Sequence, residues 1–159
     1  MKIKIVCVGN LKEKFLKDAA SEYRKRLGKF TKIEVIEVVE ERLSDKASEK
    51  NIADCLKREE EKILKQISDD EYVIDLSIEG QMISSEEFSM NIADLMVSGC
   101  SDIVFVIGSS HGLGDGIRRR ANFSLSLSKM TFPHQIARVI LMEQIYRAFK
   151  INSNEPYHK

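Results

Sequence analysis

Residues 101–149 read SDIVFVIGSSHGLGDGIRRRANFSLSLSKMTFPHQIARVILMEQIYRAF, and this segment decides the fold. It begins with Ile103–Ile107, a run that is apolar at every position and mostly β-branched. Such a run predicts a strand covered on both faces, as in the middle of a parallel sheet. Four glycines follow within nine residues, at positions 108, 112, 114 and 116. Because glycine adopts positive φ and lets backbone approach a ligand closely, a binding loop is predicted there.

The same segment predicts a second short strand, Asn122–Ser128, followed by the turn Lys129–Pro133 and a helix that is apolar over most of its surface. In open α/β sheets, ligands bind in loops at the carboxyl ends of strands. Two such loops in succession, one rich in glycine and one rich in hydroxyl groups, predict a pocket. The plainer alternative is that the glycines only form a tight turn and the serines only cover a strand surface.

Two common nucleotide-binding motifs do not fit the glycine-rich loop. A phosphate-binding loop needs Gly-Lys-Ser or Gly-Lys-Thr, and the sequence contains neither triplet. A dinucleotide fingerprint needs Gly-x-Gly-x-x-Gly after the first strand, whereas Gly112–Gly116 has another spacing and comes late in the chain.

The rest of the chain alternates between strand and helix patterns. Strands are expected at Lys2–Val8, Thr31–Val39 and Glu71–Ile78, and helices at Leu11–Leu27, Glu49–Ile67 and Ser84–Gly99. A turn is expected at Glu79-Gly80. This alternation predicts an α/β fold with a mainly parallel sheet and helices on both faces, in a single domain spanning residues 1–159.

Local signals mark the helix ends. Gly28 stands where a C-cap is expected, and Ser84 with Glu87 three residues later forms a capping-box pattern. The run Glu59-Glu60-Glu61 lies in the second helix and is expected on its solvated face.

Composition indicates an ordinary globular protein of the cytoplasm. No run of about 18 apolar residues is present, so no membrane span is expected. The cysteines, Cys7, Cys55 and Cys100, are odd in number and are expected as buried reduced thiols. No His/Cys pair has metal-ligand spacing, so no metal site is expected. The formal net charge is zero, but residues 34–61 hold ten acids and five bases, which leaves 15 acids and 20 bases elsewhere and permits a local basic patch for RNA.

Several motifs resemble one known family over essentially the whole chain. They are KIKIVCVGNLKEKFLKDAASEYRKRL at the start, VFVIGSSHGLGDGIRRRAN and LSLSKMTFPHQIARVILMEQIYRAFKI in the last third, and EPYHK at the end. Together they resemble the bacterial ribosomal RNA large-subunit methyltransferase H family of the SPOUT superfamily. The resemblance implies a C-terminal trefoil knot, a rare feature that periodicity does not reveal.

The resemblance also implies S-adenosylmethionine as the cofactor, bound mainly by the backbone of three knotted loops. The positions that match the family's cofactor contacts are Leu76, Gly108, Leu127, Ser128, Lys129, Met130, Thr131 and Phe132. Leu127, Met130 and Phe132 are apolar and could line a slot for adenine.

The reaction implied is methylation of N3 of a pseudouridine in 23S ribosomal RNA, on the assembled ribosome. From the residues alone, Tyr157, His158 and Lys159 would be a frayed tail, but in the family this tail reaches the active site. His158 is therefore expected to accept the proton or stabilise the anion, with Tyr157, Lys159 and Arg147 orienting the base or a phosphate. His134 is expected in a structural role, and His111 as an exposed loop residue.

The last helix is apolar over more than one stripe, which is too much for packing on one sheet face. It is either buried in the core or paired with another chain. We expect a two-fold homodimer, as in the family, in which the tail of one subunit completes the site of the other. The cluster Arg118–Arg120, expected in an exposed turn, is a candidate phosphate contact. The alternative function is a non-catalytic ribosome- or RNA-binding module with the same fold.

Overall fold

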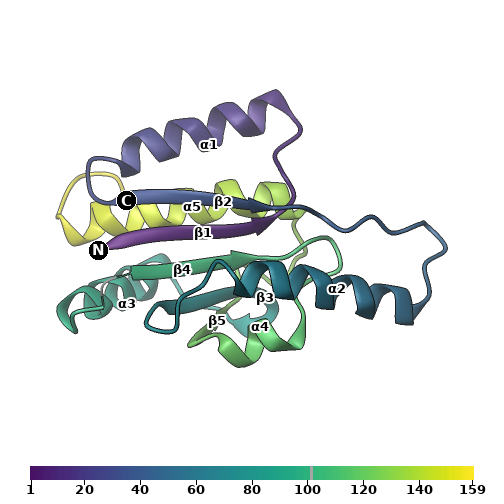
Figure 1. The fold of residues 1–159 in the computed structure, drawn as a ribbon. Coiled ribbons are helices and arrows are strands. Elements are labelled where there is room, and N and C mark those ends of the chain that lie inside the picture. The colour runs from purple at the N-terminus through teal and green to yellow at the C-terminus, as the bar shows by residue number, and fades with distance from the viewer. Residues whose placement is uncertain (101) are drawn as a thin grey trace.

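The computed structural model describes residues 1–100 and 102–159; Ser101, where the quoted segment begins, lies outside the described residues. Within these ranges, five parallel strands form one sheet in the order β2-β1-β4-β3-β5 (Figure 1). The strands are β1 Lys2–Val8, β2 Lys32–Val38, β3 Tyr72–Gln81, β4 Asp102–Ile107 and β5 Phe123–Leu125. The helices are α1 Lys14–Leu27, α2 Glu49–Leu64, α3 Ser85–Val97, α4 Asp115–Arg120 and α5 His134–Asn152.

Strand β4 lies between β1 and β3, and every residue from Ile103 to Ile107 is buried. Its side chains alternate between two cores because successive residues of a strand point to opposite faces. Ile103, Phe105 and Ile107 belong to one cluster, and Val104 and Val106 to the other. The prediction of a strand covered on both faces is confirmed.

Helices cover both faces of the sheet, as predicted. The larger core packs against residues of α1, α3 and α5, and α5 lies between the other two helices. The smaller core packs against Ile63 of α2 and Ile117 of α4. In the described part of the chain, no helix is long and apolar enough to cross a bilayer.

The predicted helix ends are confirmed where the sequence carried explicit capping signals. The Ser84 hydroxyl accepts a hydrogen bond from the Glu87 amide at 3.1 Å, and the Glu87 carboxylate accepts one from the Ser84 amide at 2.7 Å. Gly28 is the C-cap of α1, and its amide donates to the Arg24 carbonyl at 3.1 Å.

The turn expected at Glu79-Gly80 is wrong, because β3 continues to Gln81. The strand carries an irregularity: both Leu76 and Gln81 pair with Leu125, so the intervening residues curl away from the ladder. A Cβ on Gly80 would lie 2.7 Å from the Leu125 carbonyl carbon, which shows how closely the curl approaches β5.

Other boundaries also differ from expectation. Arg118–Arg120 lie in helix α4 rather than in an exposed turn, β5 covers only Phe123–Leu125 instead of Asn122–Ser128, and α2 ends at Leu64 instead of Ile67. Glu59 is not on a solvated face, since its exposed fraction is 2%. The trefoil knot stays a prediction.

Candidate active site

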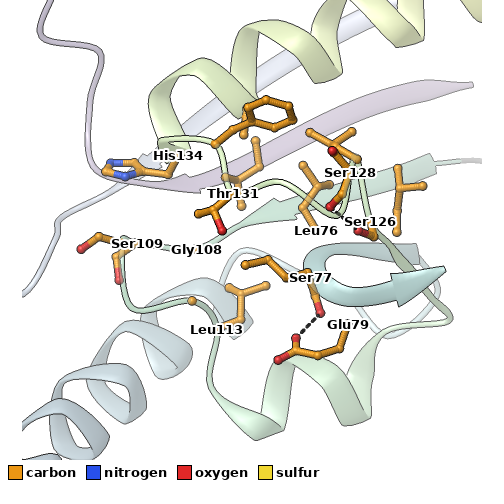
Figure 2. A pocket seen from close by; sticks show the side chains of 18 of the residues that line it. Leu76, Ser77, Glu79, Gly108, Ser109, Leu113, Ser126, Ser128, Thr131 and His134 are labelled. Atoms are coloured by element: carbon orange, nitrogen blue, oxygen red, sulfur yellow. Dashed lines mark hydrogen bonds between the residues drawn. The ribbon is translucent and has the colours of Figure 1, made fainter. Parts of the chain in front are cut away.

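A cavity of about 290 Å³ opens at the carboxyl ends of β3, β4 and β5 (Figure 2). Three segments far apart in the sequence line it: the end of β3, the glycine-rich loop after β4, and the segment that joins β5 to α5. The parallel sheet brings them together because its strands end at one edge. The predicted pocket between two successive loops is therefore present, with β3 adding a third wall.

The β3 wall carries a carboxylate that is held by its neighbours. The Ser77 hydroxyl donates to Glu79 at 3.1 Å, and the Arg118 guanidinium donates to the same oxygen at 3.4 Å. A backbone hydrogen bond within Glu79, the Ser77 hydroxyl and the charge of Arg118 together lower the pKa of Glu79. Glu79 is therefore ionised at neutral pH and forms an ion pair with Arg118 at the cavity wall.

The β4 wall is a tight turn. The Gly112 amide donates to the Ser109 carbonyl at 2.9 Å, and Gly112 has φ +87°, a conformation that favours glycine. A Cβ on Gly108 would lie only 2.2 Å from the Gly112 carbonyl oxygen. Glycine at position 108 is thus required for the loop to fold back on itself beside the cavity.

The third wall combines hydroxyl groups with apolar side chains. The Ser128 hydroxyl accepts a hydrogen bond from the Met130 amide at 3.0 Å, and the Ser126 hydroxyl donates to the Ser128 carbonyl at 3.1 Å. Met130 and Phe132 expose 74% and 37% of their surface, which is a large apolar area for a segment next to a cavity. This wall offers an apolar slot bordered by backbone polar groups.

Seven of the eight residues predicted for the cofactor line this cavity; the exception, Lys129, is exposed and is not part of the lining. The lining suits the expected cofactor in chemical type. Leu76 and Leu127 offer apolar contact for a flat base, Ser128 and Thr131 offer hydroxyl groups, and the Glu79 carboxylate suits a cation.

The residues predicted for catalysis form a second cluster at the end of α5. Arg147 donates to Glu143 at 2.5 Å, and the Tyr157 hydroxyl donates to the same carboxylate oxygen at 3.2 Å. The His158 ring lies between Arg147, at 3.3 Å from Nδ1, and Glu86, at 2.7 Å from Nε2. The Arg147 guanidinium also lies over the Tyr157 ring, 4.8 Å from its centroid. The tail is folded onto its own chain, and Lys159 at its end is exposed.

The ionisation states in this cluster follow from burial and pairing. Burial, followed by hydrogen bonding to Tyr23, raises the pKa of the Tyr157 hydroxyl, which therefore stays neutral and acts as a hydrogen-bond donor. The hydrogen bond from His158 lowers the pKa of Glu86.

The tail cluster and the cavity do not meet within one chain. None of Arg147, Tyr157, His158 and Lys159 is among the residues that line the cavity. Arg147 follows Ala137, which also lines it, by 10 helical residues, or roughly 15 Å along α5. Figure 1 shows both chain termini at the edge of the sheet where β1 begins, whereas the cavity lies where the strands end.

The other candidates from the sequence are placed as follows. His111 is exposed in the glycine-rich loop, and His134 is half-buried at the start of α5; both border the cavity. Arg120 donates to the carbonyls of Ser68 and Glu71 at 2.8 and 2.9 Å, and these hydrogen bonds hold its side chain against the loop before β3.

The cysteines are free thiols: Cys7 and Cys55 are buried, and Cys100 is partly buried. Among the described residues, no group of three or more His, Cys, Asp or Glu side chains could hold a metal ion.

Sequence reasoning missed Ser77, Glu79 and Arg118 as cavity residues. Glu79 was assigned to a turn and Arg118 to a phosphate-binding cluster, and no sequence pattern connects two positions 39 residues apart.

Comparisons with known proteins agree with one another. The family described as "Predicted SPOUT methyltransferase" matches residues 1–158. Proteins named "Ribosomal RNA large subunit methyltransferase H" from Bifidobacterium animalis subsp. lactis and Clostridium acetobutylicum are each 54% identical over 159 residues, covering 100% of both chains. A solved structure of a probable methylase family protein from Haemophilus influenzae Rd KW20 has a TM-score of 0.57 at 16% identity, covering 99% of this chain and 70% of that chain. That likeness shows the fold alone.

Proposed function

The chain belongs to the SPOUT methyltransferases, within the ribosomal RNA large subunit methyltransferase H family, and from this premise we propose that it methylates N3 of a pseudouridine in 23S ribosomal RNA with S-adenosylmethionine. The observation that carries the proposal is the cavity at the carboxyl ends of β3, β4 and β5, lined by seven of the eight residues expected to bind this cofactor.

The cavity residues have distinct tasks in this proposal. When bound, the cofactor supplies a methyl group on a positively charged sulfur, which an in-line nucleophile can attack. Leu76, Leu127 and Met130 exclude water from the apolar parts of the ligand, and the turn at Gly108 presents backbone polar groups. The ionised Glu79 stabilises positive charge in the cavity.

In this proposal, the tail residues and Arg147 orient and deprotonate the pseudouridine base that accepts the methyl group. The imide nitrogen of pseudouridine must lose its proton before or during attack, and His158 is the acceptor of that proton. Tyr157 is neutral, so it does not serve as the base and instead helps to orient the base or a phosphate. Arg147 and Lys159 supply positive charge to the RNA.

A second copy of the chain completes the site, because the tail packs on Arg147, roughly 15 Å along α5 from the cavity of its own subunit. In a two-fold dimer with antiparallel α5 helices, the tail of each subunit would approach the cavity of the other. Phe15 and Ile136, at the starts of α1 and α5, expose 66% and 37% of their surface. The Lys12 amide donates to the Gln135 side chain at 2.9 Å, which holds these two helix starts side by side. This apolar area next to the cavity is the proposed contact with the partner.

The substrate in this proposal is the assembled ribosome in the cytoplasm. A chain with zero formal net charge gains little from counterion release on free RNA. Additional contacts with the assembled ribosome would supply the binding affinity that free RNA alone does not provide.

The test is transfer of a labelled methyl group to intact ribosomes that lack the modification, with pseudouridine-free ribosomes as the matched control. We expect label only in the pseudouridine-bearing particles. Cofactor binding without label in either sample would refute the substrate. Loss of both label and cofactor binding would favour a non-catalytic RNA-binding module.

A further inference from the structure

We propose that Glu59 and Glu60 of α2 are positioning residues that clamp the two ends of the glycine-rich loop, residues 108–116, into the shape that the cofactor cavity requires. The inference rests on the proposed function for its ligand. Neither glutamate lines the cavity, so both act through the loop. Figure 1 shows α2 and α4 on the same side of the sheet, with the loop leading from β4 into α4.

Glu59 holds the start of the loop. Its exposed fraction is 2%, and one carboxylate oxygen accepts a hydrogen bond from the Ser109 hydroxyl at 3.0 Å. The other oxygen accepts from the Glu41 amide at 3.1 Å and from the Cys55 thiol at 3.7 Å. A buried carboxylate needs such donors, because an unpaired one would be costly. Ser109 lines the cavity next to Gly108, so this contact fixes the cavity wall directly.

Glu60 holds the end of the loop. Its carboxylate accepts a hydrogen bond from the Gly116 amide at 2.6 Å, in the first turn of α4. The N-cap of α4 is Gly114, which has no side chain to accept from that amide. Glu60 therefore supplies from α2 the acceptor that an N-cap side chain would normally provide.

Two of the four glycines in the loop are explained by this contact. A Cβ on Gly114 or on Gly116 would lie 2.4 Å from a Glu60 carboxylate oxygen. Glycine at these positions admits the Glu60 side chain, whereas Gly108 and Gly112 serve the turn beside the cavity. The glycine-rich character of the loop thus has two separate causes.

The consequence is a cavity wall that is ordered before the cofactor arrives. Two adjacent residues on one helix fix both ends of a loop that would otherwise lose conformational freedom on binding. Preorganisation of this kind raises affinity by removing an entropic cost from the binding step.

The experiment compares Glu60→Ala with Glu60→Gln, whose amide oxygen can still accept from Gly116, and with the matched control Glu61→Ala on the exposed neighbour. Glu59→Gln is a second test variant. Its side chain has only one acceptor oxygen, whereas Glu59 has two, which accept hydrogen bonds from Ser109, Glu41 and Cys55. Hydrogen–deuterium exchange of residues 109–118 is measured without cofactor, and S-adenosylmethionine affinity by calorimetry. Circular dichroism establishes that each variant is folded.

For Glu60→Ala we expect faster exchange in the loop and affinity weakened about tenfold, equivalent to about 1.4 kcal/mol. Glu60→Gln should recover most of the affinity, Glu59→Gln should quicken exchange at Ser109–Gly112, and Glu61→Ala should match the wild type. Unchanged exchange in Glu60→Ala, or quickened exchange with unchanged affinity, would overturn the inference. If the wild type itself binds no cofactor, the proposed function fails instead, and the exchange arm alone decides whether the glutamates order the loop.

Discussion

Gly108 stands where the chain has no room for a side chain, since the nearest atoms to a Cβ would be backbone atoms of Gly112 at 2.2 and 2.6 Å. Backbone cannot swing aside as a flexible side chain can, so a methyl group there must move the whole turn. At the residue scale, this position couples the shape of the loop to the cavity more tightly than any other glycine of the segment.

Replacing Gly108 by alanine should therefore lower the free energy of unfolding by about 1–3 kcal/mol, the usual cost of overpacking. It should also weaken S-adenosylmethionine binding by about tenfold or more. Urea denaturation and calorimetry measure the two effects. Gly28→Ala is the control, because its Cβ would be 3.4 Å from the nearest atom at an ordinary helical φ of −59°. Equal stability of the two variants would contradict the steric argument.

Asp75 predicts a specific dependence of stability on pH. It is fully buried, accepts a hydrogen bond from the Ser124 hydroxyl, and its second carboxylate oxygen has no partner among the described residues. Burial raises the pKa of Asp75 above its ordinary value of 3.8. The folded protein then binds more protons than the unfolded chain above that value, so this residue's contribution to stability is lost as pH rises through the folded pKa.

Asp75→Asn removes this titration while keeping an acceptor for Ser124. The difference in free energy of unfolding between Asp75→Asn and wild type should move in favour of the variant as pH rises from about 4 to about 7. Denaturation at several pH values checks this, with Asp70→Asn, on the exposed surface, as control. A constant difference across that range would show that Asp75 does not titrate there.

Hydrogen bonds between individual side chains and their partners were predicted from local patterns only where both partners are close in the chain. Ser84 and Glu87 form the predicted capping box because the motif is complete within four residues. Glu59 was expected on a solvated face, since three consecutive acids look like helix surface. Its partner Ser109 lies 50 residues away, and no local pattern carries that information.

At the scale of elements, the cap of α3 gives a direct test of helix stabilisation. Ser84→Ala removes the acceptor for the Glu87 amide and should lower the free energy of unfolding by about 1 kcal/mol. Ser98→Ala, at the exposed C-cap of the same helix, should change it by less than about 0.5 kcal/mol. Thermal or chemical denaturation distinguishes these outcomes, and equal effects would remove the special role of the capping box.

Most strands were predictable because their apolar runs are strong local signals. The predicted β1 is confirmed residue for residue, and β2 and β4 within one residue at each end. Helix α4 was missed because Ile117 is the one apolar residue among its six, too few for a helical pattern. The extension of β3 was missed because it depends on the irregular pairing with β5, where Leu125 meets both Leu76 and Gln81.

At the scale of the whole molecule, the dimer proposal depends on an exposed apolar surface. Ile136→Asp places a charge on the start of α5 and should convert the dimer to a monomer without unfolding it, because Ile136 is already 37% exposed. Methyl transfer should fall with dimer content, while cofactor binding persists. Light scattering provides the measurement, and Val97→Asp, on an 89% exposed residue of α3, is the matched control. A variant that stays dimeric would place the interface elsewhere.

Deletion of Tyr157–Lys159 tests the division of the site between subunits. Methyl transfer should fall by about 100-fold or more, the contribution typical of a positioned proton acceptor. Cofactor affinity and dimerisation should remain, because these residues lie outside the cavity lining. His158→Gln separates the loss of the proton acceptor from the loss of the tail. Wild-type rates after the deletion would exclude the tail from catalysis.

The order of the strands in the sheet has a consequence for how the protein is made. Strand β1 leaves the exit tunnel first, but β4, its neighbour, follows about a hundred residues later and must enter between β1 and β3. Until β4 is synthesised, β1 and β3 of the nascent chain each have an unpaired edge at the position that β4 will later fill. Unpaired strand edges make such a chain prone to aggregation. Pairing across so long a separation also predicts slow folding. Because two of the three cavity walls and the tail are encoded after that point, a stalled chain would have neither a complete cavity nor the tail.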